Sequence, residues 1–190
     1  DTSLSDAART KIKVEDILFA RLDDDRVPER FTYAAGPQTQ LALDLPWNLQ
    51  GMKIYQPGAM SDVFRPFDLK YMVVDPAGSG GDEVAYGAGG VLNGYVHLLR
   101  IAGLRGGMTK ENCRTILQMA SDLGVAKIFV EANQGVGMAR LLMLQELTEL
   151  KNANPHFPTI GVEDYYSKGQ KERRIIDTVS PLTRKHKLVV

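Results

Sequence analysis

Two carboxylates, Asp75 and Glu131, occupy matching places in the sequence. Each is the first polar residue after an apolar run, and each is followed at once by a segment of small residues and glycines. If the two runs are neighbouring parallel strands, both side chains project from the carboxyl edge of one sheet, where open α/β sheets usually bind ligands. Two carboxylates this close repel each other or take up a proton unless a cation lies between them.

The residue types around these acids predict a hard cation. The chain has one cysteine, Cys113, and three scattered histidines, so neither a Cys-based nor a His-based metal site is indicated. Carboxylate oxygens suit Mg²⁺ or Mn²⁺. Two such ions about 3.5 to 4 Å apart can activate a water and stabilise the leaving oxygen in phosphodiester cleavage. Asp82, in the glycine-rich segment after Asp75, is a weaker candidate for an outer metal ligand.

The same stretches also have structural explanations. Asp75 can form an Asx turn before Pro76, and Glu131 can favour the positive end of a following helix. The glycines of GSGGDE, residues 78–83, look like a loop that cradles phosphate, but such a loop must open a helix, whereas this one leads into a predicted strand. The carboxylates are therefore the better candidates for the chemistry than the loop backbone.

A regular pattern of elements begins at residue 67. Apolar runs predict strands at 69–74, 83–92 and 95–101, and Asn93-Gly94 between the last two is a strong hairpin signal, because both residues tolerate the positive φ of a type I′ turn. Three antiparallel strands are therefore expected first.

Helices then alternate with strands. Thr109 can cap a helix that Gly124 ends. The further elements expected are a strand at 126–130, a well-buried helix at 135–151, a strand at 157–166, a helix at 169–186 with Ile175, Ile176, Val179 and Leu182 inward, and a strand opening at 187–190. The order βββαβαβαβ predicts an α/β fold in which a mixed sheet is flanked by helices.

Residues 1–66 differ from the rest of the chain. Pro37, Pro46, Pro57 and Pro66 interrupt helices and central strands, so this segment is predicted to be an arm or an interdomain connector. No apolar run approaches the roughly 20 residues that cross a bilayer, and the start lacks the features of a signal peptide. We therefore expect no membrane partner.

The charge is balanced overall but not locally. Lys and Arg number 23 and Asp and Glu number 23, which argues against a dedicated nucleic-acid-binding module. Residues 167–187, however, hold seven basic side chains and two acidic ones. Candidates for DNA-backbone contacts are Lys168, Lys171, Arg173 and Arg174. The alternative is a solvated helix face with local Lys–Glu pairs.

Three stretches together carry a family resemblance: VVDPAGSGGDEVAYG, IFVEANQGVG and YYSKGQKERRIIDTVSPLTRKHKLVV. They resemble the C-terminal nuclease domain of the large terminase subunit of tailed bacteriophages, closest to the T7-like group. The resemblance covers residues 67–190 and implies a ribonuclease H-like fold, with residues 1–66 as the connector from an ATPase domain that this chain lacks.

The resemblance also implies a function. The expected activity is a two-metal endonuclease that uses Mg²⁺ or Mn²⁺ to cut concatemeric double-stranded DNA at the start and end of viral genome packaging. The implied catalytic metal ligands are Asp75 and Glu131, with Asp82 as the further loop acid. The implied partners are double-stranded DNA, the portal protein and the small terminase subunit, in the host cell cytoplasm.

One departure from the family limits this expectation. The third acid of the family lies in an Asp-Asp motif on a helix after the strand that KLVV begins, and this sequence stops at Val190. Asp164 and Asp177 do not sit in that context, so the chain is expected to bind metal weakly and to cut slowly or not at all. The 67–190 domain is accordingly predicted to be truncated at its C-terminus.

Three alternatives stay open. A Holliday-junction resolvase-like nuclease would share the fold and would prefer branched DNA. An actin-like sugar kinase fragment would need a second phosphate-binding hairpin, which the sequence does not show. A non-catalytic docking domain of the packaging motor is consistent with the zero net charge.

Overall fold

The computed structural model describes residues 12, 16–20, 23–33, 56–76, 83–132 and 137–190, the side chains of Lys171 and Glu172 excepted. The chain divides into two compact units. We call Leu69–Gly90 with Leu98–Lys168 the central unit, and Asp1–Asp68 with Val91–His97 and Gly169–Val190 the terminal unit.

A six-stranded sheet has the order β10-β7-β6-β5-β8-β9. Its strands are β5 (Leu69–Asp75), β6 (Val84–Leu92), β7 (Tyr95–Leu104), β8 (Lys127–Glu131), β9 (Gly161–Tyr165) and β10 (Leu188–Val189). Strand β8 pairs in parallel with both β5 and β9, and β10 pairs in parallel with β7. The predicted mixed sheet and the predicted order of strands and helices along the chain from residue 67 are confirmed.

The predicted hairpin joins β6 to β7. Asn93 and Gly94 have φ angles of 50° and 74°, the positive values that a type I′ turn requires at both central positions. A Cβ added at Gly94 would meet no atom within 4 Å, so the backbone conformation rather than lack of space favours glycine there. The two strands are thereby set antiparallel.

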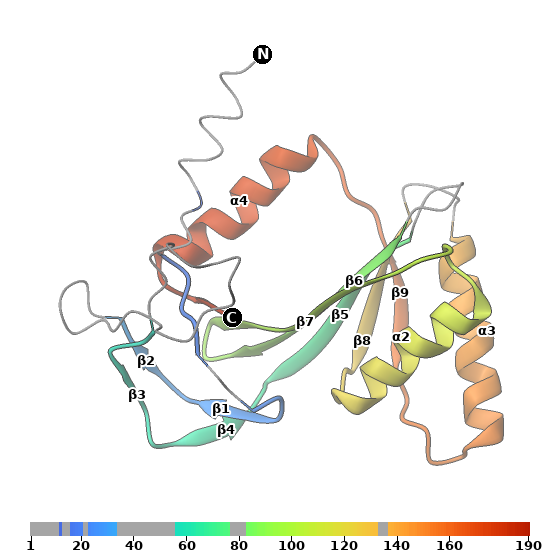
Figure 1. Ribbon diagram of the computed structural model, residues 1–190, viewed down its shortest axis with the longest axis horizontal. Coiled ribbons are helices and arrows are strands. Elements are labelled where there is room, and N and C mark those ends of the chain that lie inside the picture. Colours follow the sequence, from blue (N-terminus) through green and yellow to red (C-terminus); the bar gives the residue numbers. More distant parts are fainter. Residues whose placement is uncertain (1–11, 13–15, 21–22, 34–55, 77–82, 133–136) are drawn as a thin grey trace. The chain divides into compact units, whose positions relative to one another are not determined.

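Two helices of the central unit pack side by side against one face of its strands (Figure 1). Helix α2 (Lys110–Asp122) begins as predicted, because the Thr109 hydroxyl accepts a hydrogen bond from the Asn112 N–H at 3.2 Å. Its buried side chains are Cys113, Ile116, Leu117 and Ala120. Helix α3 is Met138–Ala153. The side chains of β5 and β8 that face this core are Met72, Val74, Ile128 and Val130, all buried.

Two expectations about helix burial are wrong. Helix α3 is not well buried, since Met138 is 68% and Leu141 56% exposed. An apolar sequence does not determine how many neighbours a helix finds, and α3 packs mainly on α2 and β9. In helix α4 (Lys171–Arg184), Ile175 is exposed rather than inward, whereas Ile176 is half-buried.

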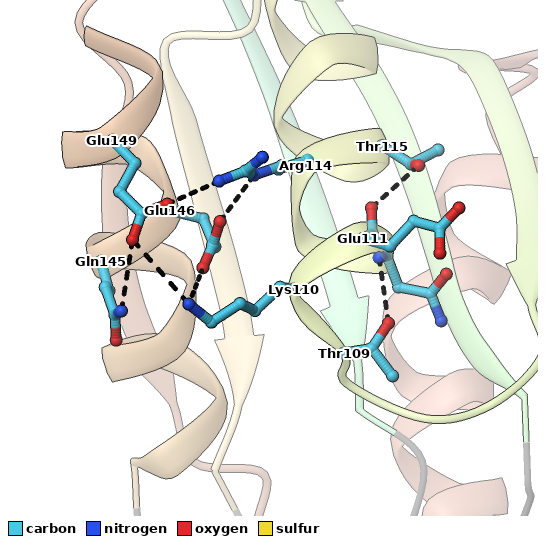
Figure 2. Close-up of polar contacts among 9 residues, drawn as sticks. Thr109, Lys110, Glu111, Arg114, Thr115, Gln145, Glu146 and Glu149 are labelled. Carbon is cyan, nitrogen blue, oxygen red and sulfur yellow. Dashed lines mark hydrogen bonds and ion pairs between the residues drawn. The ribbon is translucent and has the colours of Figure 1, made fainter. Parts of the chain in front are cut away.

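An ion-pair network that the sequence did not predict joins α2 to α3 (Figure 2). Glu146 of α3 is fully buried, yet its carboxylate accepts a hydrogen bond from Arg114 Nε at 2.7 Å. The same guanidinium donates from Nη2 to Glu149 at 2.5 Å, and Lys110 Nζ lies 3.6 Å from Glu146. Hydrogen bonds to Glu146 and Glu149 raise the pKa of Arg114 above its ordinary value, because they favour its charged form. The two helices are therefore linked by charge as well as by apolar packing.

This network predicts an asymmetric response to mutation. Arg114→Met should lower the melting temperature of the chain by about 5 °C, because it leaves the buried Glu146 carboxylate without its closest partner. Glu146→Met should lower it less, since the basic side chains that remain are half-exposed and can be hydrated. Thermal unfolding followed by circular dichroism measures both. The control is Arg105→Met, which removes an ion pair with Glu83 that is exposed on both sides; an equal shift in the control would contradict the prediction.

The terminal unit holds short strands that the sequence did not signal. Strand β1 (Arg26–Pro28) pairs with β4 (Phe64–Pro66), and β2 (Phe31–Thr32) pairs with β3 (Ala59–Met60), both antiparallel. A small core of this unit contains Leu18, Phe31, Tyr95 and Val189. The assignment of residues 1–66 to a connector stays a prediction. Within the described residues, no helix is long and apolar enough to cross a membrane.

Candidate active site

The register of β5 and β8 places Asp75 beside Glu131. Val74 and Val130 are paired in the parallel ladder, and each acid is the next residue of its strand. Neighbouring strands lie about 4.8 Å apart, so the two acids are within reach of one shared ion. Because successive side chains alternate between the faces of a sheet, both acids point away from the face on which Val74 and Val130 are buried.

The face that carries the acids also carries an apolar pocket. Leu69, Tyr71 and Val73 of β5 line a pocket of about 490 Å³ together with Phe129 and Tyr165 of the neighbouring strands. Burial raises the pKa of the Tyr71 phenol above its ordinary value. Neither α2 nor α3 covers this face, because both pack on the opposite one. The central unit therefore has a hydrophobic surface on the same face as the two acids, next to them along the strands.

Glu131 is more enclosed than Asp75. Its side chain is half-buried, whereas Asp75 is exposed. The Ser167 hydroxyl donates a hydrogen bond to Glu131 Oε1. The backbone continues the ladder past this point, since the Ala132 N–H donates to the Tyr165 carbonyl at 2.9 Å. Strand β9 thus lies beside Glu131, and Ser167, just after that strand, binds one of its carboxylate oxygens.

The two acids fit a divalent cation in type and placement. Carboxylate oxygens from adjacent strand ends can converge on one ion, and the exposure of Asp75 leaves room for water ligands and a substrate oxygen. No group of three His, Cys, Asp or Glu side chains suited to a metal occurs in the part of the chain that the structure describes. Asp82 lies outside the described residues, so its predicted role as an outer ligand stays a prediction.

Asp164 lies near the two acids but on the other face. It is paired with Val130 in the parallel ladder of β8 and β9, so its side chain points toward the helices. Its Oδ2 lies 3.5 Å from the position of a Cβ built on Gly137, the residue before α3. Asp164 therefore does not supply the third acid of this site, as the sequence context suggested.

The predicted DNA-binding side chains fall in both units. Lys168 ends the central unit and is exposed, directly after Ser167. Arg173 and Arg174 belong to α4 in the terminal unit. Arg173 Nε lies 3.8 Å from the carboxylate of Asp177, which is four residues further along the helix, and both side chains are exposed. Lys171 begins α4, and its side chain is outside the described set. Their contacts with DNA stay predictions.

Comparison with known proteins decides the family. A family model described as "Terminase Bacteriophage T7, Ribonuclease H-like domain" matches residues 74–188. The chain belongs to this terminase family. The predicted T7-like terminase resemblance and the predicted ribonuclease H-like fold are thereby confirmed, and the matched residues of the terminase domain include both Asp75 and Glu131.

Individual terminases are similar to this chain. The large terminase subunit of Enterobacteria phage T3 is 27% identical over 189 residues, which are 99% of this chain and 31% of that protein. The chain thus spans less than a third of this curated relative. Among solved structures, the nuclease domain of the large terminase subunit of bacterial virus Sf6 is 17% identical, with a TM-score of 0.39, over 54% of this chain and 39% of that one. The human cytomegalovirus terminase nuclease domain, in a structure described as manganese-soaked and inhibitor-bound, is 12% identical, with a TM-score of 0.45. This match covers 65% of this chain and 62% of that one.

Sequence reasoning missed Ser167. It follows the predicted strand by one residue and precedes the basic stretch, which drew attention to Lys168 instead. The signal was its place just past the end of a strand, because β9 runs parallel to β8 and ends beside Glu131.

Proposed function

We propose that this terminase domain is a divalent-metal-dependent endonuclease that hydrolyses phosphodiester bonds in double-stranded DNA. The observation that carries the proposal is the parallel register that sets Asp75 and Glu131 next to each other on one face of the sheet. Membership of the terminase family supports the same reaction class.

Each acid has a distinct part in this proposal. Asp75 and Glu131 would hold Mg²⁺ or Mn²⁺ through their carboxylate oxygens. A bound pair of ions would activate a water and stabilise the leaving oxygen. Asp75, being exposed, forms the side from which a DNA phosphate arrives, and Glu131, being half-buried, forms the enclosed side. The exposed Lys168 ammonium would attract the phosphate backbone without reading sequence.

The proposed biological role follows from the relatives. Within a complete large terminase subunit, this domain would cut concatemeric viral DNA at the beginning and end of packaging, together with the portal protein and the small terminase subunit, in the host cytoplasm. The similarity to the large subunit of phage T3 supports this role.

A plasmid assay tests the proposed activity. Supercoiled plasmid incubated with Mn²⁺ or Mg²⁺ should be nicked and linearised only slowly by this chain, and EDTA should stop the reaction. A chain extended beyond Val190 should cut faster than this one, because two carboxylates supply few of the roughly six oxygens that a hard dication prefers. Cutting should show little sequence preference and should fall steeply with salt, because phosphate contacts would supply the affinity.

The same assay separates the alternatives. Selective cleavage of four-way junctions over linear duplex would favour a resolvase-like enzyme. An extended chain that binds DNA but cuts none in either metal would contradict the proposal and favour a docking domain.

A further inference from the structure

We infer that Ser167 is a positioning residue that orients the Glu131 carboxylate for cation binding. The inference rests on the proposed function, because it concerns the same metal site. It assigns a role to a side chain that lies outside the carboxylate set, in the segment that follows β9.

The pairing of β8 with β9 brings Ser167 near Glu131. Glu131 is paired with Tyr165 in the parallel ladder, and Ala132 extends the ladder by a hydrogen bond to the Tyr165 carbonyl. Ser167 comes two residues later, past the end of β9, and is half-buried. The backbone pairing therefore ends within two residues of Ser167, whose hydroxyl reaches the Glu131 carboxylate.

The hydrogen bond restricts the orientation of the Glu131 carboxylate. A serine hydroxyl has one proton to donate, and Oε1 accepts it. A glutamate side chain has more rotatable bonds than an aspartate, so Glu131 has more conformational freedom to lose on binding metal than Asp75 does. A hydrogen bond that restricts Glu131 beforehand reduces that loss.

The size of the effect follows from other metal sites. Partners that hydrogen-bond to metal-ligating side chains typically contribute 10- to 100-fold to metal affinity or activity. Ser167 should lie near the lower end of that range, because it holds one oxygen of one ligand. A purely structural serine would instead affect unfolding and leave metal affinity unchanged.

Metal titration of the isolated chain tests the inference without relying on activity. Mn²⁺ binding is measured by electron paramagnetic resonance and by calorimetry. Ser167→Ala should weaken Mn²⁺ binding about 10-fold, and Ser167→Thr, which keeps the hydroxyl, should stay within about 2-fold. The melting temperature without metal should be the same for both variants. In the plasmid assay, Ser167→Ala should raise the Mn²⁺ concentration needed for half-maximal cutting, with a smaller effect at saturating metal.

Matched controls separate the possible failures. Ser121→Ala removes a half-buried hydroxyl from α2, on the other face of the sheet, and should leave Mn²⁺ affinity unchanged. If Ser167→Ala binds Mn²⁺ as tightly as the wild type while Glu131→Gln binds it weakly, the inference is overturned and the proposed metal site stands. If the wild type binds no Mn²⁺, or Glu131→Gln binds it equally well, the proposed function fails instead. If Ser167→Ala does not fold, Ser167→Cys replaces it, because a thiol is only a weak hydrogen-bond donor. Its Mn²⁺ affinity is then compared with those of the wild type and Glu131→Gln in the same way.

Discussion

Asp75→Asn and Glu131→Gln are each expected to reduce metal-dependent DNA cleavage by at least about 100-fold in a chain extended beyond Val190. The two acids occupy adjacent strands and share one face, so the loss of either removes one of the two carboxylates that these strand ends offer to a cation. Both replacements keep the size of the side chain but exchange one carboxylate oxygen for an NH₂ group, which donates hydrogen bonds instead of accepting them. Initial rates of plasmid nicking at saturating Mn²⁺ measure the effect.

The fold should survive both substitutions. Without metal, removing one of two neighbouring carboxylates relieves repulsion, so the melting temperature should hold or rise. Glu163→Gln is the matched control. Glu163 lies on β9, two positions before Tyr165, and forms an ion pair with Lys127 at 2.8 Å. It should cut like the wild type. Full activity in Asp75→Asn or in Glu131→Gln would exclude that residue as an essential ligand.

The terminal unit is expected to lose about 3 kcal/mol of stability between pH 6.5 and pH 4 because of His97. The imidazole is 2% exposed, and burial lowers its pKa to about 4. It packs against Phe31, Phe67 and Tyr95, with ring centroids 5.7, 5.1 and 6.4 Å away, and neither ring nitrogen has a hydrogen-bond partner among the described residues. Such a pocket favours the neutral ring.

The direction of this pH dependence follows from which state, folded or unfolded, binds the proton at His97. Below pH 6.5 the unfolded chain takes up a proton at His97 while the folded chain does not, so acid favours unfolding until the folded ring also protonates near pH 4. Urea unfolding at several pH values measures the slope of the unfolding free energy against pH. His97→Leu should flatten it over this range, whereas His156→Gln, at an exposed histidine, should leave it unchanged. An unchanged slope in His97→Leu would contradict the prediction.

Much of the sheet and helix α2 could be predicted because their signals are local. Asn93-Gly94 specifies its own turn, Thr109 caps its own helix, and apolar runs of strand length identify β5 and β8. The pairing of Asp75 with Glu131 needed one further assumption, that the two strands are parallel neighbours, and the topology confirms it. Whether these acids bind metal stays a prediction.

The remaining features depend on contacts between distant parts of the chain. Glu146 looks like an ordinary surface residue of an amphipathic helix, and only the approach of α2 explains its burial beside Arg114. Strands of two or three residues, such as β2 and β3, are too short to show a periodicity. Ser167 becomes significant only when β9 is known to lie beside β8.

The alternation of side chains along β8 has a consequence for how this domain can diverge. A single residue inserted or deleted between Lys127 and Glu131 would move Glu131 to the helix side of the sheet and turn Val130 outward. The same change in β5 would displace Asp75. Natural variants that keep the acids should therefore change length only in the connecting segments, and the spacing within each strand should be constant even where its apolar residues exchange with one another.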